Sequence, residues 1–165
     1  MILVALGANL PSSEFGAPPA SLEAALRLLE GESVRVKRCS SWYRSAPVPP
    51  SDQPWYVNGV AAVETMRSPA ELLAALHRIE ARFGRMRRER NEARVLDLDL
   101  LAYHDRMSRY GDPAPELPHP RLHQRAFVLV PLAEIAPDWR HPRLGLTVEE
   151  MVGRLPEGQG PLQRC

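Results

Sequence analysis

Two acidic residues interrupt an apolar run near the middle of the chain, in the sequence Arg-Val-Leu-Asp-Leu-Asp-Leu-Leu at 94–101. The run predicts a β-strand, and side chains alternate between the two faces of a strand. Asp97 and Asp99 therefore share one face, and the leucines beside them point to the other. Carboxylates on a largely buried strand are costly unless they are paired or bind a metal. The pattern favours a strand with one face in a core and the other in a polar site.

Arginines are concentrated in the segment that precedes this strand. They are Arg85, Arg87, Arg88, Arg90 and Arg94. Guanidinium groups bind phosphate oxygens through paired hydrogen bonds, and Mg²⁺ is held by one or two carboxylates together with phosphates and water. Acids for a metal beside arginines for phosphate are typical of a nucleoside triphosphate site. The alternative is an edge strand with a solvated acidic face next to a solvated basic loop.

Composition places the chain among ordinary globular proteins. With 165 residues, 44% hydrophobic and 25% charged, we expect a single domain over 1–165. The formal net charge of +1 gives no general attraction to nucleic acid or to a membrane. Cys39 and Cys165 have no metal-binding or disulfide-framework spacing, so we expect a cytoplasmic protein. The apolar run at 2–6 is too short for a signal peptide or a membrane span.

Hydrophobic periodicity and turn residues predict the order of the elements. Strands are expected over 2–6, 33–45, 56–65 and 95–103, and helices over 21–31 and 68–83. Ser21 and Ser68 are the expected N-caps, and Glu71 completes a capping box with Ser68. Prolines make residues 46–54 a stiff loop. A short helix around 123–135, an amphipathic turn at 147–155 and a frayed tail at 156–165 are expected to follow.

The predicted order of the first six elements is β-α-β-β-α-β. This order is typical of the α+β ferredoxin-like fold, in which a mainly antiparallel sheet carries its helices on one face. The other face would then be free of helices and open to form a site. The fold hosts many unrelated functions, so the residues on that face must decide the function.

Several aromatic and amide side chains lie near the predicted strand ends and the proline-rich loop. They are Trp42, Tyr43, Trp55, Tyr56, Asn58 and Phe127. An asparagine side chain suits a heterocycle with an amide-like edge, and aromatic rings offer a place to stack. Plain core packing is the alternative, above all for Trp42 and Tyr43. Glu80, at the negative end of its helix, is expected to have a partner such as a ribose hydroxyl or an arginine.

A set of motifs, in order along the chain, resembles a known family. The motifs are Ser-Trp-Tyr-Arg-Ser-Ala-Pro at 41–47, Asp-Gln-Pro-Trp-Tyr-Val-Asn at 52–58, Arg-Ile-Glu at 78–80, Arg-Val-Leu-Asp-Leu-Asp at 94–99, Leu-Pro-His-Pro at 117–120 and Arg-Ala-Phe at 125–127. Together they resemble the 6-hydroxymethyl-7,8-dihydropterin pyrophosphokinases of folate biosynthesis, from Leu6 to about Pro137. The chain departs from many members at 91–93, where Asn-Glu-Ala replaces Trp-Gly-Pro, and at Ala46 and Pro120.

The resemblance implies transfer of diphosphate from ATP to the pterin hydroxymethyl group, with release of AMP. It places two Mg²⁺ ions on Asp97 and Asp99 and catalytic arginines at Arg85 and Arg94. It assigns the pterin pocket to Ser45, Val48, Trp55, Tyr56, Asn58 and Phe127, and the nucleotide side to Glu80, Arg87, Arg90, His119 and Arg125. We expect a monomer that binds these two small substrates and neither nucleic acid nor membranes.

Two other functions remain open at this point. A two-metal nucleotidyltransferase or phosphohydrolase on the same fold would need a third carboxylate near Asp97 and Asp99, and none is evident in the sequence. A ferredoxin-like RNA-binding module would need exposed aromatic side chains in mid-strand and a basic sheet face. His119 is likewise open between a phosphate contact and a lone surface histidine.

Overall fold

The computed structural model describes residues 1–84 and 93–165. Within them one antiparallel sheet has the strand order β5-β1-β4-β3-β6, and β2 also pairs with β4. The strands are β1 (Ile2–Ala8), β2 (Arg35–Cys39), β3 (Tyr43–Ser45), β4 (Tyr56–Glu64), β5 (Asp97–Tyr103) and β6 (Leu162–Arg164). The helices are α1 (Pro18–Gly31), α2 (Pro69–Arg82), α3 (Ala126–Ile135) and α4 (Val148–Val152), with a 3₁₀ turn at Leu122–Gln124. This arrangement confirms the predicted α+β class.

The start of α1 differs from the prediction. Ala17 is the N-cap and two prolines open the helix, so Ser21 lies one turn inside it. Proline is favoured at the first helical positions because its φ angle is already helical and those positions need no N–H. By contrast, α2 begins as predicted. The Ser68 hydroxyl accepts a hydrogen bond from the Glu71 amide at 3.3 Å, and the Glu71 carboxylate accepts one from the Ser68 amide at 2.7 Å.

The single strand predicted over 33–45 is two strands. β2 pairs with residues 61–64 of β4 and β3 with residues 56–58 of the same strand. Between them the Trp42 ring lies over Gly59, where an added Cβ would be 2.5 Å from the ring. The alternation of β-forming residues continues across this point, so the sequence pattern does not reveal the break.

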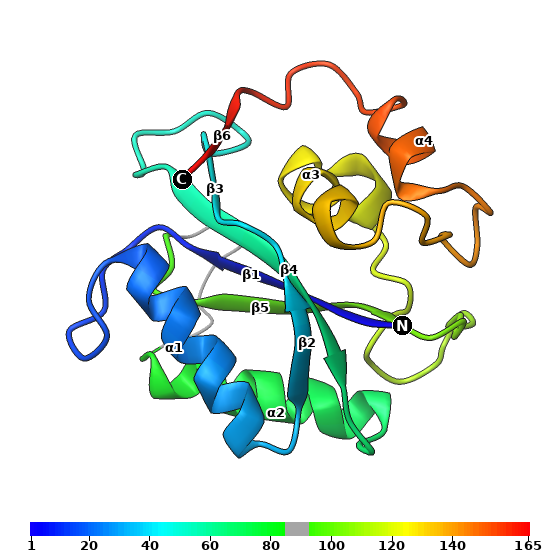
Figure 1. The fold of residues 1–165 in the computed structure, drawn as a ribbon, viewed down its shortest axis with the longest axis horizontal. Helices are drawn as coiled ribbons and strands as arrows, with labels where there is room; N and C mark the ends of the chain where they lie inside the picture. Colours follow the sequence, from blue (N-terminus) through cyan, green and yellow to red (C-terminus); the bar gives the residue numbers. More distant parts are fainter. Residues whose placement is uncertain (85–92) are drawn as a thin grey trace.

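Helices cover both faces of the sheet, which Figure 1 shows between α1 and α2 below and α3 and α4 above. Leucines of α1 and α2 pack on Val4, Leu98 and Leu100 in one buried cluster. Leucines of α3, with Met151 of α4, pack on Leu3 and neighbouring strand residues in a second. The expectation of a helix-free second face is therefore wrong for the part that α3 covers. The remainder of that face, towards Asp97, is where the site lies.

Strand β5 brings acidic and apolar side chains to the same face at different points. Leu98 and Leu100 belong to the cluster under α1 and α2, so Asp97 and Asp99 face the other way. The pairing with β1 then shifts by one residue, because Leu3 pairs with Ala102 while Val4 pairs with Leu100. Because of this bulge, the Leu101 side chain packs in the second hydrophobic cluster, the one under α3. The strand thus has a polar start and an apolar end on the α3 face.

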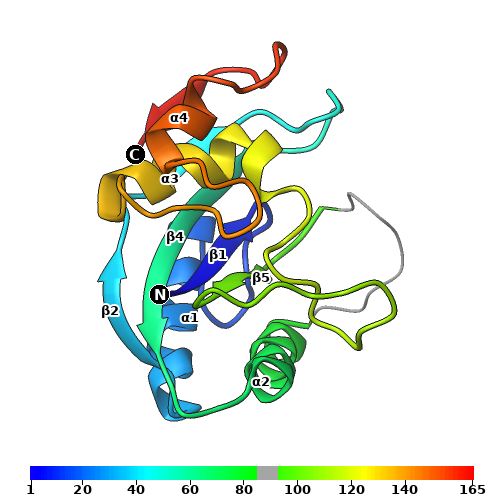
Figure 2. The same ribbon diagram turned by 90° about the vertical axis from the view of Figure 1, so that its right-hand side faces the viewer.

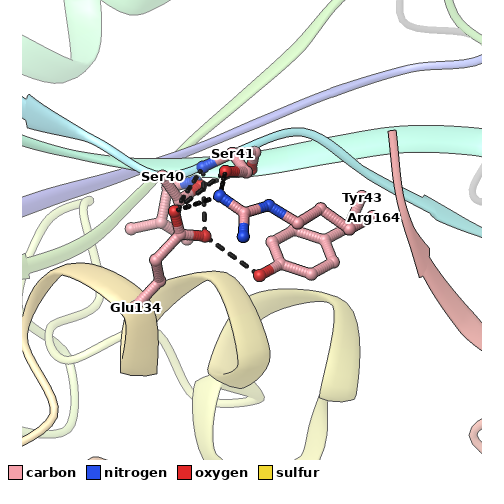
Figure 3. Close-up of polar contacts among 6 residues, drawn as sticks. Ser40, Ser41, Tyr43, Glu134 and Arg164 are labelled. Carbon is pink, nitrogen blue, oxygen red and sulfur yellow. Dashed lines mark hydrogen bonds and ion pairs between the residues drawn. The ribbon is translucent and has the colours of Figure 1, made fainter.

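The tail at 156–165, expected to be frayed, returns to the sheet. Leu162 pairs with Ser45, and Arg164 pairs with Tyr43, which adds β6 beside β3. The Arg164 guanidinium lies 3.4 Å from the Glu134 carboxylate on α3, which also accepts a hydrogen bond from the Tyr43 hydroxyl at 2.9 Å (Figure 3). The exposed backbone of an edge strand is a natural partner for such a segment. None of the helices in the described ranges has the length and apolar character to cross a membrane.

Candidate active site

The floor of the site is made by small residues of the central strand β1. Gly7 pairs with Asp97 of β5 on one side and with Asn58 of β4 on the other. Two residues along β1, Ala5 lies beside Asp99. Side chains this small leave room above the sheet, and a cavity of about 540 Å³ lies there. Its walls come from β3, β4 and β5, from the loop at 46–53, from the segment at 119–128 and from the tail.

Two arginines accompany the two carboxylates at one end of the cavity. The Arg94 guanidinium donates a hydrogen bond to Asp97, and the Arg125 guanidinium lies 3.7 Å from Asp99. Both pairs are partly exposed to the cavity. Each carboxylate therefore has a cationic neighbour, which offsets the repulsion between the two acids.

The same carboxylates have the chemistry of a magnesium site. Across 1–84 and 93–165 no group of three or more His, Cys, Asp and Glu side chains is placed to hold a metal. A closed zinc site needs such a group, whereas Mg²⁺ accepts one or two carboxylates and completes its shell with phosphates and water. Asp97 and Asp99, open to a cavity beside arginines, fit the second case.

Asn9 holds the backbone of Arg94 in place, and the sequence analysis missed this role. Its side-chain oxygen accepts a hydrogen bond from the backbone amide of Arg94 at 2.7 Å. Its backbone amide donates to the Arg94 carbonyl at 2.9 Å. The Asn9 side chain also donates to the Pro54 carbonyl at 3.1 Å. It is only 2% exposed. A buried polar residue directly after an apolar strand was the available signal.

A buried amide lies at the β3–β4 end of the cavity, two strands from Asp97. Asn58 donates a hydrogen bond to the Ser45 hydroxyl at 2.8 Å, and both side chains are buried. Nearby, the Tyr56 hydroxyl lies 3.2 Å from the Gln53 side-chain oxygen, and burial raises the pKa of Tyr56. Phe127, in the first turn of α3, adds an aromatic face to the wall, and the Arg125 guanidinium lies 5.4 Å from its ring centre. The amide, hydroxyl and aromatic groups gathered here are of the kinds that suit a flat heterocycle.

His119 and Arg125 join the carboxylate end from the segment before α3. Burial lowers the pKa of His119, against the opposing effect of Asp99, and its Nδ1 accepts a hydrogen bond from the Arg121 amide at 3.2 Å. Because Nδ1 serves as an acceptor, Nε2 is the ring nitrogen left to face a ligand. Burial also lowers the pKa of Arg125, which nevertheless stays charged because a guanidinium keeps its proton in proteins.

The sequence is similar to a known family and to several of its named members. Residues 3–137 match the family model of the 7,8-dihydro-6-hydroxymethylpterin-pyrophosphokinases. The chain belongs to this family. It is 48% identical over 129 residues to a 2-amino-4-hydroxy-6-hydroxymethyldihydropteridine pyrophosphokinase of Synechocystis sp., a match that covers 78% of this chain and 64% of that protein. The protein of the same name from Pseudomonas aeruginosa is 42% identical, over 86% of this chain and 83% of its own length.

Solved structures of the family share the fold. The wild-type HPPK-DHPS of Plasmodium falciparum, solved with STZ-DHP, superimposes with a TM-score of 0.72 at 14% sequence identity. The match covers 93% of this chain and 42% of that one, so this chain is similar to one part of a longer protein. At this identity the likeness concerns the fold alone.

Most of the residues that the resemblance singled out, within the described ranges, line one cavity. They are Ser45, Val48, Tyr56, Asn58, Arg94, Asp97, Asp99, His119, Arg125 and Phe127. Trp55 does not line it; the Arg44 guanidinium lies 5.9 Å from its ring centre instead. Trp42 and Tyr43 have structural roles, against the α1–α2 cluster and on Glu134 respectively. Arg85, Arg87 and Arg90 lie outside the described residues.

Glu80 is placed behind the site rather than in it. Its side chain is only 2% exposed, and its carboxylate accepts a hydrogen bond from the Leu98 amide at 2.8 Å. Leu98 lies between Asp97 and Asp99 in β5. Glu80 therefore fixes the strand segment that carries both carboxylates, and this backbone amide is a partner that the sequence analysis did not consider.

Substitution of Gly7 by alanine should weaken binding at the amide end of the cavity. A Cβ at this position would lie 3.1 Å from the Asn58 side-chain oxygen, closer than ordinary van der Waals contact. Asn58 cannot move freely because it is bonded to Ser45. We expect a several-fold loss of affinity for the ligand of that end with a small change in melting temperature, measured by calorimetry and thermal unfolding. Unchanged affinity would show that Asn58 adjusts without effect.

Proposed function

We propose that this protein transfers diphosphate from ATP to the hydroxymethyl group of 6-hydroxymethyl-7,8-dihydropterin, as a step of folate biosynthesis. The hydroxyl oxygen forms a bond to the β-phosphorus, the bond from that phosphorus to the α,β-bridging oxygen breaks, and AMP leaves. The hydroxyl proton passes to solvent. Family membership supports this reaction, together with one observation: a single cavity joins an acidic and basic end to an amide and aromatic end.

The amide end suits the pterin. Asn58 uses one N–H on Ser45, which leaves its other N–H and its oxygen for a ligand. A pterin ring has a donor and acceptor edge of the same kind, and its flat faces can stack on Phe127. Ser45, Tyr56 and Val48 complete this end, with Val48 partly exposed at the rim.

The acidic and basic end suits the triphosphate of ATP. Arg94, Arg125 and His119 line it, and guanidinium groups pair well with phosphate oxygens. Asp97 and Asp99 would hold Mg²⁺, which supplies charge neutralisation and a lowered pKa for the attacking hydroxyl when bound. We assign Arg85 to the same phosphate contacts, and Arg87 and Arg90 to the nucleotide, on the resemblance alone.

Two features weigh against the alternative functions. In the described ranges no third carboxylate joins Asp97 and Asp99, as a two-metal nucleotidyltransferase would require. The open part of the sheet presents these carboxylates, which would repel the phosphates of an RNA strand.

We further propose that the protein acts as a monomer in the cytoplasm, a reducing compartment in which its two free cysteines would stay reduced.

One assay separates these possibilities. The protein is incubated with Mg-ATP and 6-hydroxymethyl-7,8-dihydropterin, and the nucleotide products are resolved by chromatography. We expect AMP to appear in equal amount to the pterin diphosphate, and only when the pterin is present. Formation of ADP would indicate transfer of a single phosphoryl group, and AMP formation without pterin would indicate a hydrolase; either result would contradict the proposal.

Replacement of Asn58 by alanine should impair pterin binding and leave ATP binding largely unchanged. The buried Ser45 hydroxyl loses its partner and the pterin loses a polar contact, and each unpaired buried group costs roughly 1–3 kcal/mol. Calorimetry of both ligands on the variant tests this expectation. Equal weakening of ATP and pterin would mean that Asn58 supports the sheet rather than the pterin.

A further inference from the structure

The C-terminal tail forms part of the wall of the active-site cavity. After α4 the chain runs back past α3 and pairs with β3 as the edge strand β6 (Figures 1 and 2). Its end is held by strand pairing from Leu162 to Arg164, by the Cys165 amide, which donates to the Trp42 carbonyl at 2.9 Å, and by the ion pair of Arg164 with Glu134. The match to the family model ends at residue 137, so this segment lies beyond it.

Gln159 is the residue of the tail that reaches the cavity. It is half-buried and lines the cavity together with Ser45, Asn58 and Phe127. Its side-chain oxygen accepts a hydrogen bond at 3.0 Å from the amide of Ala126, the first residue of α3. The first amides of a helix lack partners within the helix, and the N-cap residue of α3 supplies no side-chain acceptor. Gln159 therefore caps α3 from a distant part of the chain.

This cap fixes which group of Gln159 is available to a ligand. The oxygen is used by the helix, so the amide nitrogen with its two hydrogens is the free end of the side chain. No acceptor for that nitrogen occurs among the described residues. On the far side of Gln159, Gly160 lies near Ala46 of the proline-rich loop, where an added Cβ would be 3.8 Å from that side chain. The hydrogen bond to Ala126 therefore orients the donor, and the backbone next to it passes close to the proline-rich loop.

We propose that Gln159 is a specificity-determining residue, whose amide nitrogen donates a hydrogen bond to an acceptor atom of the pterin ring. The inference rests on the proposed function for the identity of the ligand. The donor would complement Asn58 on the opposite wall, so that the pterin is recognised from both the sheet and the tail. A plain capping residue, by contrast, would stabilise α3 and make no contact with the substrate.

Substitution of Gln159 by glutamate distinguishes the two roles. Gln159→Glu keeps an oxygen to accept from Ala126, and a negative charge near a helix N-terminus is favourable, so the cap and the melting temperature should be retained. The same change removes the donor and places an acceptor against an acceptor. Gln163→Glu is the matched control, because Gln163 is exposed on β6 of the same tail and does not line the cavity.

We expect Gln159→Glu to bind 6-hydroxymethyl-7,8-dihydropterin about tenfold more weakly, to raise its KM similarly and to keep kcat, with Gln163→Glu unchanged. Affinity for Mg-ATP should change less than affinity for the pterin. Wild-type pterin affinity in a folded Gln159→Glu variant would overturn the inference and leave Gln159 as a cap. The affinities are measured without turnover, so a failure of the wild-type protein to form AMP would count against the proposed function separately.

Discussion

Replacing Asp97 with alanine is expected to reduce AMP formation below detection while the protein remains folded. Asp97 opens β5 at the acidic and basic end of the cavity and pairs there with Arg94. Its loss removes a proposed metal ligand. It also leaves the Arg94 guanidinium without this carboxylate partner, free to move into the part of the cavity that would hold phosphate. The fold should survive because Asp97 is partly exposed and its removal also relieves repulsion with Asp99.

The measurement is AMP formation over a series of Mg²⁺ concentrations, with melting temperature as the check on folding. Asp105→Ala is a suitable control, since Asp105 is an exposed acid just after β5 and does not line the cavity. Near-normal activity of Asp97→Ala at saturating Mg²⁺ would contradict a role in metal binding. We expect the same outcome for Asp99→Ala, with Arg125 as the arginine that loses its partner.

The second large effect is expected from Arg94→Ala, which should slow the chemical step by about 10²–10³. The Arg94 guanidinium lies at the carboxylate end, whereas the backbone of Arg94 is held by Asn9. Truncation of the side chain leaves those backbone bonds intact, so the local structure should persist. The pterin contacts at the other end of the cavity should be unaffected.

Single-turnover rates and pterin affinity, measured side by side, test this assignment. Arg82→Ala serves as the control because Arg82 is an exposed arginine paired with Glu14 at 3.2 Å, away from the cavity lining. Arg94→Lys should give an intermediate rate, since lysine keeps the charge but loses the two-pronged geometry. An Arg94→Ala variant that binds pterin poorly but reacts normally once saturated would place Arg94 on the pterin side.

Local signals in the sequence predicted most elements of the fold. The capping box of α2 requires only residues 68–71, and the alternation in β5 requires only residues 96–100, so both are visible without knowledge of the rest of the chain. The prediction of Ser21 as an N-cap was wrong. A serine beside a helical pattern is a common N-cap, but here the helix begins earlier, at two prolines. The break between β2 and β3 depends on Trp42 meeting Gly59 across the sheet, which no local pattern encodes.

The same distinction separates the predicted from the missed parts of the site. Asp97, Asp99 and Asn58 carry their chemistry in residue type and strand position, and all three line the cavity. Ala5 and Gly7 matter because they are small, which becomes meaningful only once β1 is known to lie between β4 and β5. Gln159 lies in a segment rich in glycine and proline, and its position depends on pairing between β6 and β3. Long-range contacts of this kind leave no periodic signal.

The two separate hydrophobic clusters have a consequence for engineering this protein. The cluster under α1 and α2 lies across the sheet from the cavity, so substitutions that fill or tighten it can raise thermal stability with little effect on catalysis. The cluster under α3 supports the segment that carries Arg125 and Phe127. A loosened side chain there, such as a truncated Leu129, would shift those residues and lower substrate affinity as well as stability. Designers seeking a more heat-resistant enzyme should therefore begin with α1 and α2 and leave the opposite layer unchanged.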